Sequence, residues 1–121
     1  MKVKDIMIDE VRWIHSDKSL KEAAIKMRNS RLGALPVKND GNLVGMITDR
    51  DIVVRAIAMG QDPNLTRVRD VMTPHIVSCY EDQTVNKALS KTIRNHVNRV
   101  VVLDHRGKLV GMLSLVPELN N

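Results

Sequence analysis

The stretch Gly41-Asn42-Leu43-Val44-Gly45-Met46 returns later in the chain as Gly107-Lys108-Leu109-Val110-Gly111-Met112. A second stretch, Val3-Lys4-Asp5-Ile6-Met7, returns as Val68-Arg69-Asp70-Val71-Met72 at nearly the same spacing. Two segments that return in the same order indicate a tandem duplication and not a chance match. The chain of 121 residues is therefore interpreted as two repeats, residues 1–62 and 63–121.

Each repeat predicts the order strand, helix, strand, strand, helix. Apolar stretches at 11–14 and 76–79 predict the first strand. The first helix begins after Ser19, whose pairing with Glu22 suits a capping box, and Thr84 is the counterpart of Ser19. Strands at 34–37 and 43–48, joined by an Asp40-Gly41 turn, correspond to 99–103 and 109–114. A second helix at 51–59 ends before Gly60, which is free to take a left-handed conformation.

These elements predict an α/β fold of two pseudo-symmetric repeats. One copy of about 60 residues is marginal alone, so we expect the repeats to share one core. Phe is absent, and the aromatic residues are Trp13 and Tyr80, so Val, Ile, Leu, Met and Ala must fill this core. The second repeat is curtailed, because after Ser114 the remaining residues suffice for one or two helical turns.

Composition disfavours several classes of function. The net charge is +5, but basic residues are scattered and interleaved with acidic ones, and two aromatic residues cannot form a base-stacking platform. Both observations argue against nucleic-acid binding. No apolar run reaches the ~18 residues of a membrane span. A single cysteine, Cys79, fits a reducing, cytoplasmic setting. The four histidines lack metal-ligand spacing, and no catalytic constellation stands out, so we expect neither a metal site nor an enzyme.

The strand that ends at Thr48 is followed by Asp51 at a predicted helix start. The N–H groups and the positive dipole end of a helix attract anions. Thr48 offers a hydroxyl to a phosphate, and the two oxygens of Asp51 suit the paired hydroxyls of a ribose. Thr-x-x-Asp is equally a helix-capping motif, in which Asp51 serves only the helix. Both interpretations stay open at this point.

The duplicated pattern resembles a tandem pair of CBS domains, also called a Bateman module, of the small stand-alone prokaryotic kind. The resemblance rests on Asp5-Ile6-Met7, on Gly33-Ala34-Leu35-Pro36-Val37 and on the segment from Gly41 to Asp51. It implies a regulatory protein that binds an adenosine-containing ligand in a cleft between the repeats. The implied ligands are AMP, ADP, ATP, an NAD-type dinucleotide or S-adenosylmethionine, with no required cofactor.

The resemblance also implies roles for individual residues. Thr48 matches the phosphate-contacting hydroxyl and Asp51 the ribose-binding carboxylate. Arg99 matches a phosphate-facing residue, although Asn98 stands where relatives carry His. In the second repeat Ser114 keeps the hydroxyl, but Pro117 replaces the carboxylate, so we expect about one nucleotide per chain. The other expected ligand-binding residues are Ile14, Gly33, Ala34, Leu35, Pro36, Asp49 and Arg50.

The resemblance further implies a homodimer formed through helices. The apolar residues Ile52, Val53, Ala56 and Ile57 exceed what one buried helix face needs. An effector protein is implied without being named. The alternative function is a ligand-independent dimerisation or adaptor module, in which the Thr48 and Asp51 pair only caps a helix.

Overall fold

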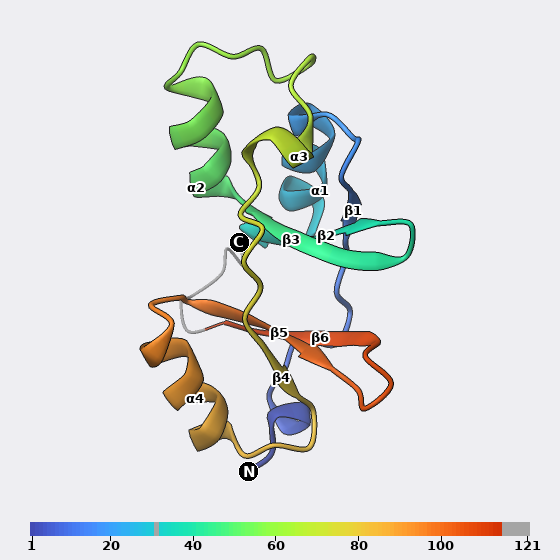
Figure 1. Ribbon diagram of the computed structural model, residues 1–121, viewed down its shortest axis with the longest axis vertical. Helices are drawn as coiled ribbons and strands as arrows, with labels where there is room; N and C mark the ends of the chain where they lie inside the picture. Colours follow the sequence, from blue (N-terminus) through green and yellow to red (C-terminus); the bar gives the residue numbers. More distant parts are fainter. Residues whose placement is uncertain (31, 115–121) are drawn as a thin grey trace. The chain divides into compact units, whose positions relative to one another are not determined.

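The computed structural model describes residues 1–30 and 32–114 (Figure 1). The described chain divides into two compact units. Among the described residues, one unit consists of residues 12–75 without residue 31, and the other combines residues 1–11 with residues 76–114. The repeats of the sequence therefore exchange segments: the first eleven residues belong with the second repeat, and residues 63–75 belong with the first.

The unit of residues 12–75 is a three-stranded sheet with helices. Its elements are β1 (Ile14–His15), α1 (Leu20–Ser30), β2 (Ala34–Asn39), β3 (Asn42–Thr48), α2 (Asp49–Asp51), η2 (Ile52–Ile57) and α3 (Val68–Val71). The strand order is β1-β2-β3, with β1 parallel and β3 antiparallel to the central β2. The turn between β2 and β3 has positive φ angles of 52° at Asp40 and 79° at Gly41, which suits the tight turn expected from that pair.

The other unit repeats this arrangement. It contains η1 (Val3–Asp5), β4 (Ser78–Tyr80), α4 (Val85–Arg94), β5 (Arg99–Leu103) and β6 (Leu109–Ser114). The strand order is β4-β5-β6, again with one parallel and one antiparallel neighbour of the central strand. The α/β repeats predicted from the sequence are confirmed. The predicted final helix of the second repeat falls outside the described residues.

Several element boundaries differ from the prediction. The first strands begin later than expected, at Ile14 and Ser78, which are the first residues in register with β2 and β5. The helix expected at 51–59 begins at Asp49, directly after its cap Thr48. From Ile52 to Ile57 its turns are of the wide π type, and Gly60 takes a φ of 76° just beyond.

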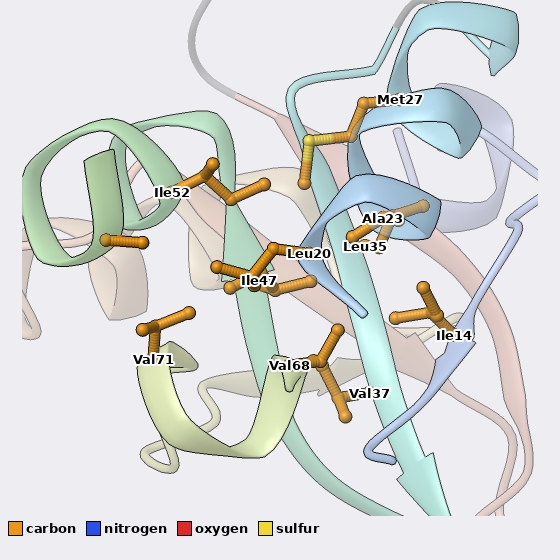
Figure 2. Packing of buried hydrophobic residues seen from close by; sticks show 11 residues of the cluster. Ile14, Leu20, Ala23, Met27, Leu35, Val37, Ile47, Ile52, Val68 and Val71 are labelled. Carbon is orange, nitrogen blue, oxygen red and sulfur yellow. The ribbon is translucent and has the colours of Figure 1, made fainter. Parts of the chain in front are cut away.

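The core of the unit of residues 12–75 lies between its sheet and its helices. Figure 2 shows side chains from α1 and α3 converging on the strands. Leu20 of α1 and Val68 of α3 are completely buried, as are Leu35 and Ile47 of the sheet. Since Val68 lies beyond residue 62, this core uses apolar residues that the sequence assigns to the second repeat.

The second unit has a core of its own. Its members are Val3, Val77, Cys79, Ala88, Val100, Val102 and Leu113. Each cluster draws on both repeats of the sequence, because Val3 and Val68 each complete the cluster of the opposite repeat.

The exchanged segments are held by matching backbone hydrogen bonds. Thr73 donates its N–H to the Met46 carbonyl oxygen at 2.8 Å, and Met46 donates its own to the Thr73 carbonyl oxygen at 2.9 Å. In the other unit Ile8 and Met112 exchange the same two bonds, at 2.8 and 2.9 Å. Each three-stranded sheet thus gains a short extended neighbour along β3 or β6.

Candidate functional site

Thr48 and Asp51 form a reciprocal capping box at the start of α2. The Thr48 hydroxyl oxygen accepts the Asp51 N–H at 3.1 Å, and the Asp51 Oδ2 accepts the Thr48 N–H at 3.0 Å. Both residues therefore satisfy backbone donors that a helix start would otherwise leave unpaired. The Thr48 and Asp51 pair therefore caps the helix, and any ligand must bind while these two hydrogen bonds are in place.

The carboxylate of Asp51 also contacts two groups outside the cap. Thr73 donates its hydroxyl to Oδ1 at 3.4 Å, and Nε of Arg55 lies 3.8 Å from the same oxygen. The Asp51 side chain is 11% exposed. Its charge is therefore largely shielded from water, but it is hydrogen-bonded and paired with a cation, as a buried carboxylate needs to be.

Asp49 and Arg50 lie on a different side of the same helix start. Together with Val53 and Val54 they line an open pocket with a volume of about 330 Å³. The Asp49 carboxylate accepts the Arg50 N–H at 2.8 Å. Thr48 and Asp51 are not among the residues that line this pocket, so the predicted residues 48–51 divide between two faces.

The predicted residues of β2 meet this helix start at one end of the strand. The Gly33 carbonyl oxygen accepts the Asp49 N–H at 2.9 Å, and Ala34 pairs with Thr48 across the ladder. Pro36 is buried and pairs with Met46. Gly33, Ala34 and residues 48–51 therefore lie together where β2 begins and β3 ends.

Ile14 and Leu35 were predicted to line a base pocket. Both belong to the hydrophobic core of their unit, with exposed fractions of 1% and 0% (Figure 2). The structure therefore places both residues inside the core, where neither is exposed on the surface of the unit.

Arg99 and Ser114 belong to the other unit. They are cross-strand partners, at the first position of β5 and the last of β6. This pairing corresponds to that of Ala34 with Thr48, so Ser114 is the structural counterpart of Thr48. Pro117, where the second repeat lacks the carboxylate, lies outside the described residues.

The described residues include no cluster of three or more His, Cys, Asp or Glu side chains able to hold a metal ion. No helix among them is long and apolar enough to cross a membrane. Cys79 is buried, and this burial raises the pKa of its thiol, which disfavours the reactive thiolate.

A histidine–carboxylate pair lies on the unit that contains β4–β6. His105 Nε2 lies 2.8 Å from Asp82 Oδ2, and the imidazole stacks on Tyr80 with ring centroids 4.6 Å apart. The hydrogen bond to Asp82 raises the pKa of His105, and the same bond lowers the pKa of Asp82. The pair links the β5–β6 hairpin to the turn before α4.

Sequence reasoning missed Thr73 and Arg55 beside Asp51. The sequence did contain a signal for Thr73. The segment Met72-Thr73, which packs in the unit with Asp51, corresponds to Met7-Ile8, which packs in the other unit. The threonine hydroxyl therefore occurs in the same unit as the Asp51 carboxylate. Arg55 follows Asp51 by four residues, which places both side chains on one helix face.

Comparison with known proteins identifies the repeats. The CBS domain family matches residues 3–57 and 68–116. The protein YlbB of Bacillus subtilis is 37% identical over 116 residues, which cover 94% of this chain and 77% of the relative. Hypoxic response protein 1 of Mycobacterium tuberculosis is 34% identical over 113 residues, covering 92% of this chain and 78% of the relative.

A solved structure supports the same assignment. The CBS domain pair of protein MJ0100, determined in complex with 5-methylthioadenosine and S-adenosyl-L-methionine, superimposes with a TM-score of 0.85 at 28% identity. The match covers 95% of this chain and 90% of that chain. With both repeats matched and the fold reproduced, the chain belongs to the CBS domain family as a tandem pair.

Proposed function

We propose that this CBS pair is a regulatory module that binds an adenosine-containing ligand, with Asp51 accepting the ribose hydroxyls. The observation that carries the proposal is the related pair of MJ0100, which binds two adenosyl compounds. The candidate ligands are AMP, ADP, ATP, an NAD-type dinucleotide and S-adenosylmethionine. All of them present the same ribose and adenine.

The capping role of Asp51 is compatible with this proposal. An ionised carboxylate offers about four lone-pair sites. Within the described residues Asp51 uses them for the Thr48 N–H and the Thr73 hydroxyl, beside the long ion pair with Arg55. Acceptor capacity therefore remains on both oxygens, and the cap fixes their positions before a ligand arrives.

The proposed mechanism is linkage without chemistry on the ligand. A ligand that binds one conformation of the pair more tightly shifts the population toward it, by no more than the difference in binding free energy. An effector protein that contacts one conformation would sense that shift. The module then needs no cofactor, and the bound nucleotide is released unchanged.

The first test is a thermal-shift screen with the candidate ligands, with guanosine nucleotides for comparison. A ligand at ~100 times its Kd adds about 2.7 kcal/mol of stability. Asp51→Ala should weaken binding of the best ligand by about tenfold to a hundredfold, since a hydrogen bond to a charged acceptor contributes roughly 1.5–3 kcal/mol. A screen with no stabilising adenosyl compound would refute the proposal and favour an adaptor.

Asp51→Ala also removes a helix cap, so a matched control is needed. Thr84 caps α4 in the other unit by accepting the Lys87 N–H at 3.2 Å. Thr84→Ala should lower the melting temperature by a comparable amount but leave ligand affinity unchanged. Equal affinity losses in both variants would mean that Asp51 acts through folding alone.

The stoichiometry follows from the difference between the repeats. The sequence carries Thr48 and Asp51 in the first, against Ser114 and Pro117 in the second. Proline has neither a carboxylate nor a backbone donor. Titration calorimetry should give about one ligand per chain, whereas two equivalent sites would contradict the assignment.

We also propose self-association through η2, which would serve an adaptor as well as a sensor. Of the four residues predicted for this surface, Ile52 and Ala56 are instead buried in the core of the unit. Val53 and Ile57, with Val54 beside them, are 58%, 51% and 46% exposed, an apolar surface suited to a second copy of the same helix. Light scattering at tens of micromolar should report a dimer, and Val53→Glu should yield monomers. Ile93→Glu, at an exposed apolar residue of α4, is the control. A monomeric wild-type protein would refute this proposal.

A further inference from the structure

The Asp51 carboxylate is held by groups from two chain segments. One oxygen accepts the Thr48 N–H at 3.0 Å, and the other faces the Thr73 hydroxyl at 3.4 Å and Arg55 Nε at 3.8 Å. The terminal torsion of an Asp side chain is broad when nothing restrains it. Contacts to both oxygens therefore fix the plane of this carboxylate.

Arg55 is itself anchored to the segment that carries Thr73. Its Nη1 donates to the carbonyl oxygens of Val71 and Met72, each at 3.3 Å. The guanidinium thus spans from the helix to the residues just before Thr73. Asp51, Arg55 and Thr73 form one connected group, in which the position of each side chain depends on the other two.

The two repeats provide an internal comparison for Thr73. Ile8 occupies the equivalent place in the other unit and makes the same pair of backbone hydrogen bonds, to Met112 instead of Met46. The hydroxyl is therefore not required to anchor the segment. It occurs in the copy that has Asp51, and an apolar residue stands in the copy whose sequence has Pro117.

We propose that Thr73 and Arg55 are positioning residues, which orient the Asp51 carboxylate so that both of its oxygens meet the ribose. This inference rests on the proposed function, because it assigns the ribose contact to Asp51. Binding groups must be held within about 0.5 Å of their productive geometry by supporting contacts. Thr73 and Arg55 supply those contacts, and they thereby determine selectivity for an intact ribose.

The test compares the affinities of AMP and its 2′,3′-dideoxy analogue, measured by titration calorimetry. The wild-type protein should prefer AMP by at least about tenfold, on the scale of hydrogen bonds to a charged group. Thr73→Val should reduce that preference by about threefold or more, and Thr73→Ser should restore it. Thr66→Val is the matched control, since the Thr66 hydroxyl donates to the Asp62 carbonyl oxygen at 2.8 Å and does not contact Asp51.

A double-mutant cycle separates positioning by Thr73 from direct contact between Thr73 and the ligand. If Thr73 acts through Asp51, Thr73→Val should not change the preference further in an Asp51→Ala background. A further loss in that background would overturn the inference, as would an unchanged preference in Thr73→Val. Arg55→Gln provides a second variant on a half-exposed side chain, in case Thr73→Val does not fold, and should lower the preference in the same direction. Absence of any preference in the wild-type protein would instead refute the ribose assignment of the proposed function.

Discussion

Replacing Gly45 by alanine should destabilise the unit of residues 12–75. A Cβ at Gly45 would lie 2.8 Å from the Thr73 carbonyl oxygen and 2.8 Å from the Met72 sulfur. The methionine side chain can rotate away, but the carbonyl oxygen belongs to backbone that is hydrogen-bonded to Met46 at 2.9 Å. The exchanged segment must therefore shift as a whole.

The magnitude follows from two opposing effects. Inserting a methyl group into a packed site typically costs about 1–3 kcal/mol. Replacing glycine by alanine also lowers the conformational entropy of the unfolded chain, which stabilises the folded protein by about 0.4–1 kcal/mol. Together these ranges allow a net loss of about 0–2.6 kcal/mol. Because the added carbon would meet a backbone oxygen at 2.8 Å, we expect the upper part of that range, about 1–2.6 kcal/mol, and more if the two hydrogen bonds between Met46 and Thr73 break.

Gly111→Ala provides the matched comparison in the other unit. There the backbone oxygen of Ile8 is 3.0 Å from the added carbon, and the nearest atom is the flexible end of Met7. The cost should therefore be smaller than at Gly45. The assay is urea denaturation followed by the fluorescence of Trp13 and by circular dichroism. A Gly45→Ala protein within ~0.5 kcal/mol of wild type, or one more stable than Gly111→Ala, would refute this reasoning.

Three further outcomes follow from local contacts. The pKa of His105, measured by NMR, should lie above its usual value of 6.5, and Asp82→Asn should return the pKa to that value. The ion pair should stabilise the fold fully between about pH 4 and 6.5. This stabilisation is lost at higher pH as His105 loses its proton, and at lower pH as Asp82 becomes protonated. An unshifted His105 would exclude this bond in solution. Thr84→Ala should cost about 1 kcal/mol of unfolding free energy, measured in urea, because the Lys87 N–H loses its cap. Cys79 should react with a thiol reagent only at the rate of unfolding, and fast labelling of the native protein would contradict its burial.

The sequence predicted the second and third strands of each repeat well because their signals are local. The Asp40-Gly41 turn and the continuous apolar runs of β5 and β6 depend on neighbours in the chain, and the observed β5 and β6 match the predicted ranges. The exchange of segments could not be predicted in this way. It depends on contacts between residues far apart in sequence, such as Met46 with Thr73.

In the candidate site, too, local features could be predicted from the sequence and long-range contacts could not. The Thr48 and Asp51 pair was visible as a local motif, and its capping geometry is present. Its two additional partners were not predicted, because Thr73 reaches Asp51 only through the exchanged segment. That Asp49 and Arg50 line a different face from Asp51 also required the observed helix start, which lies earlier than the expected one.

The exchange of Val3 and Val68 between the two cores makes each half of the chain dependent on the other. A single repeat on its own would have a first segment with no sheet to pack against and a core that lacks one of its covering residues. Two identical copies that exchanged these segments would complete both cores, as in a domain-swapped dimer. In this chain the same exchange takes place within one molecule, so deleting either half would open the core of the other.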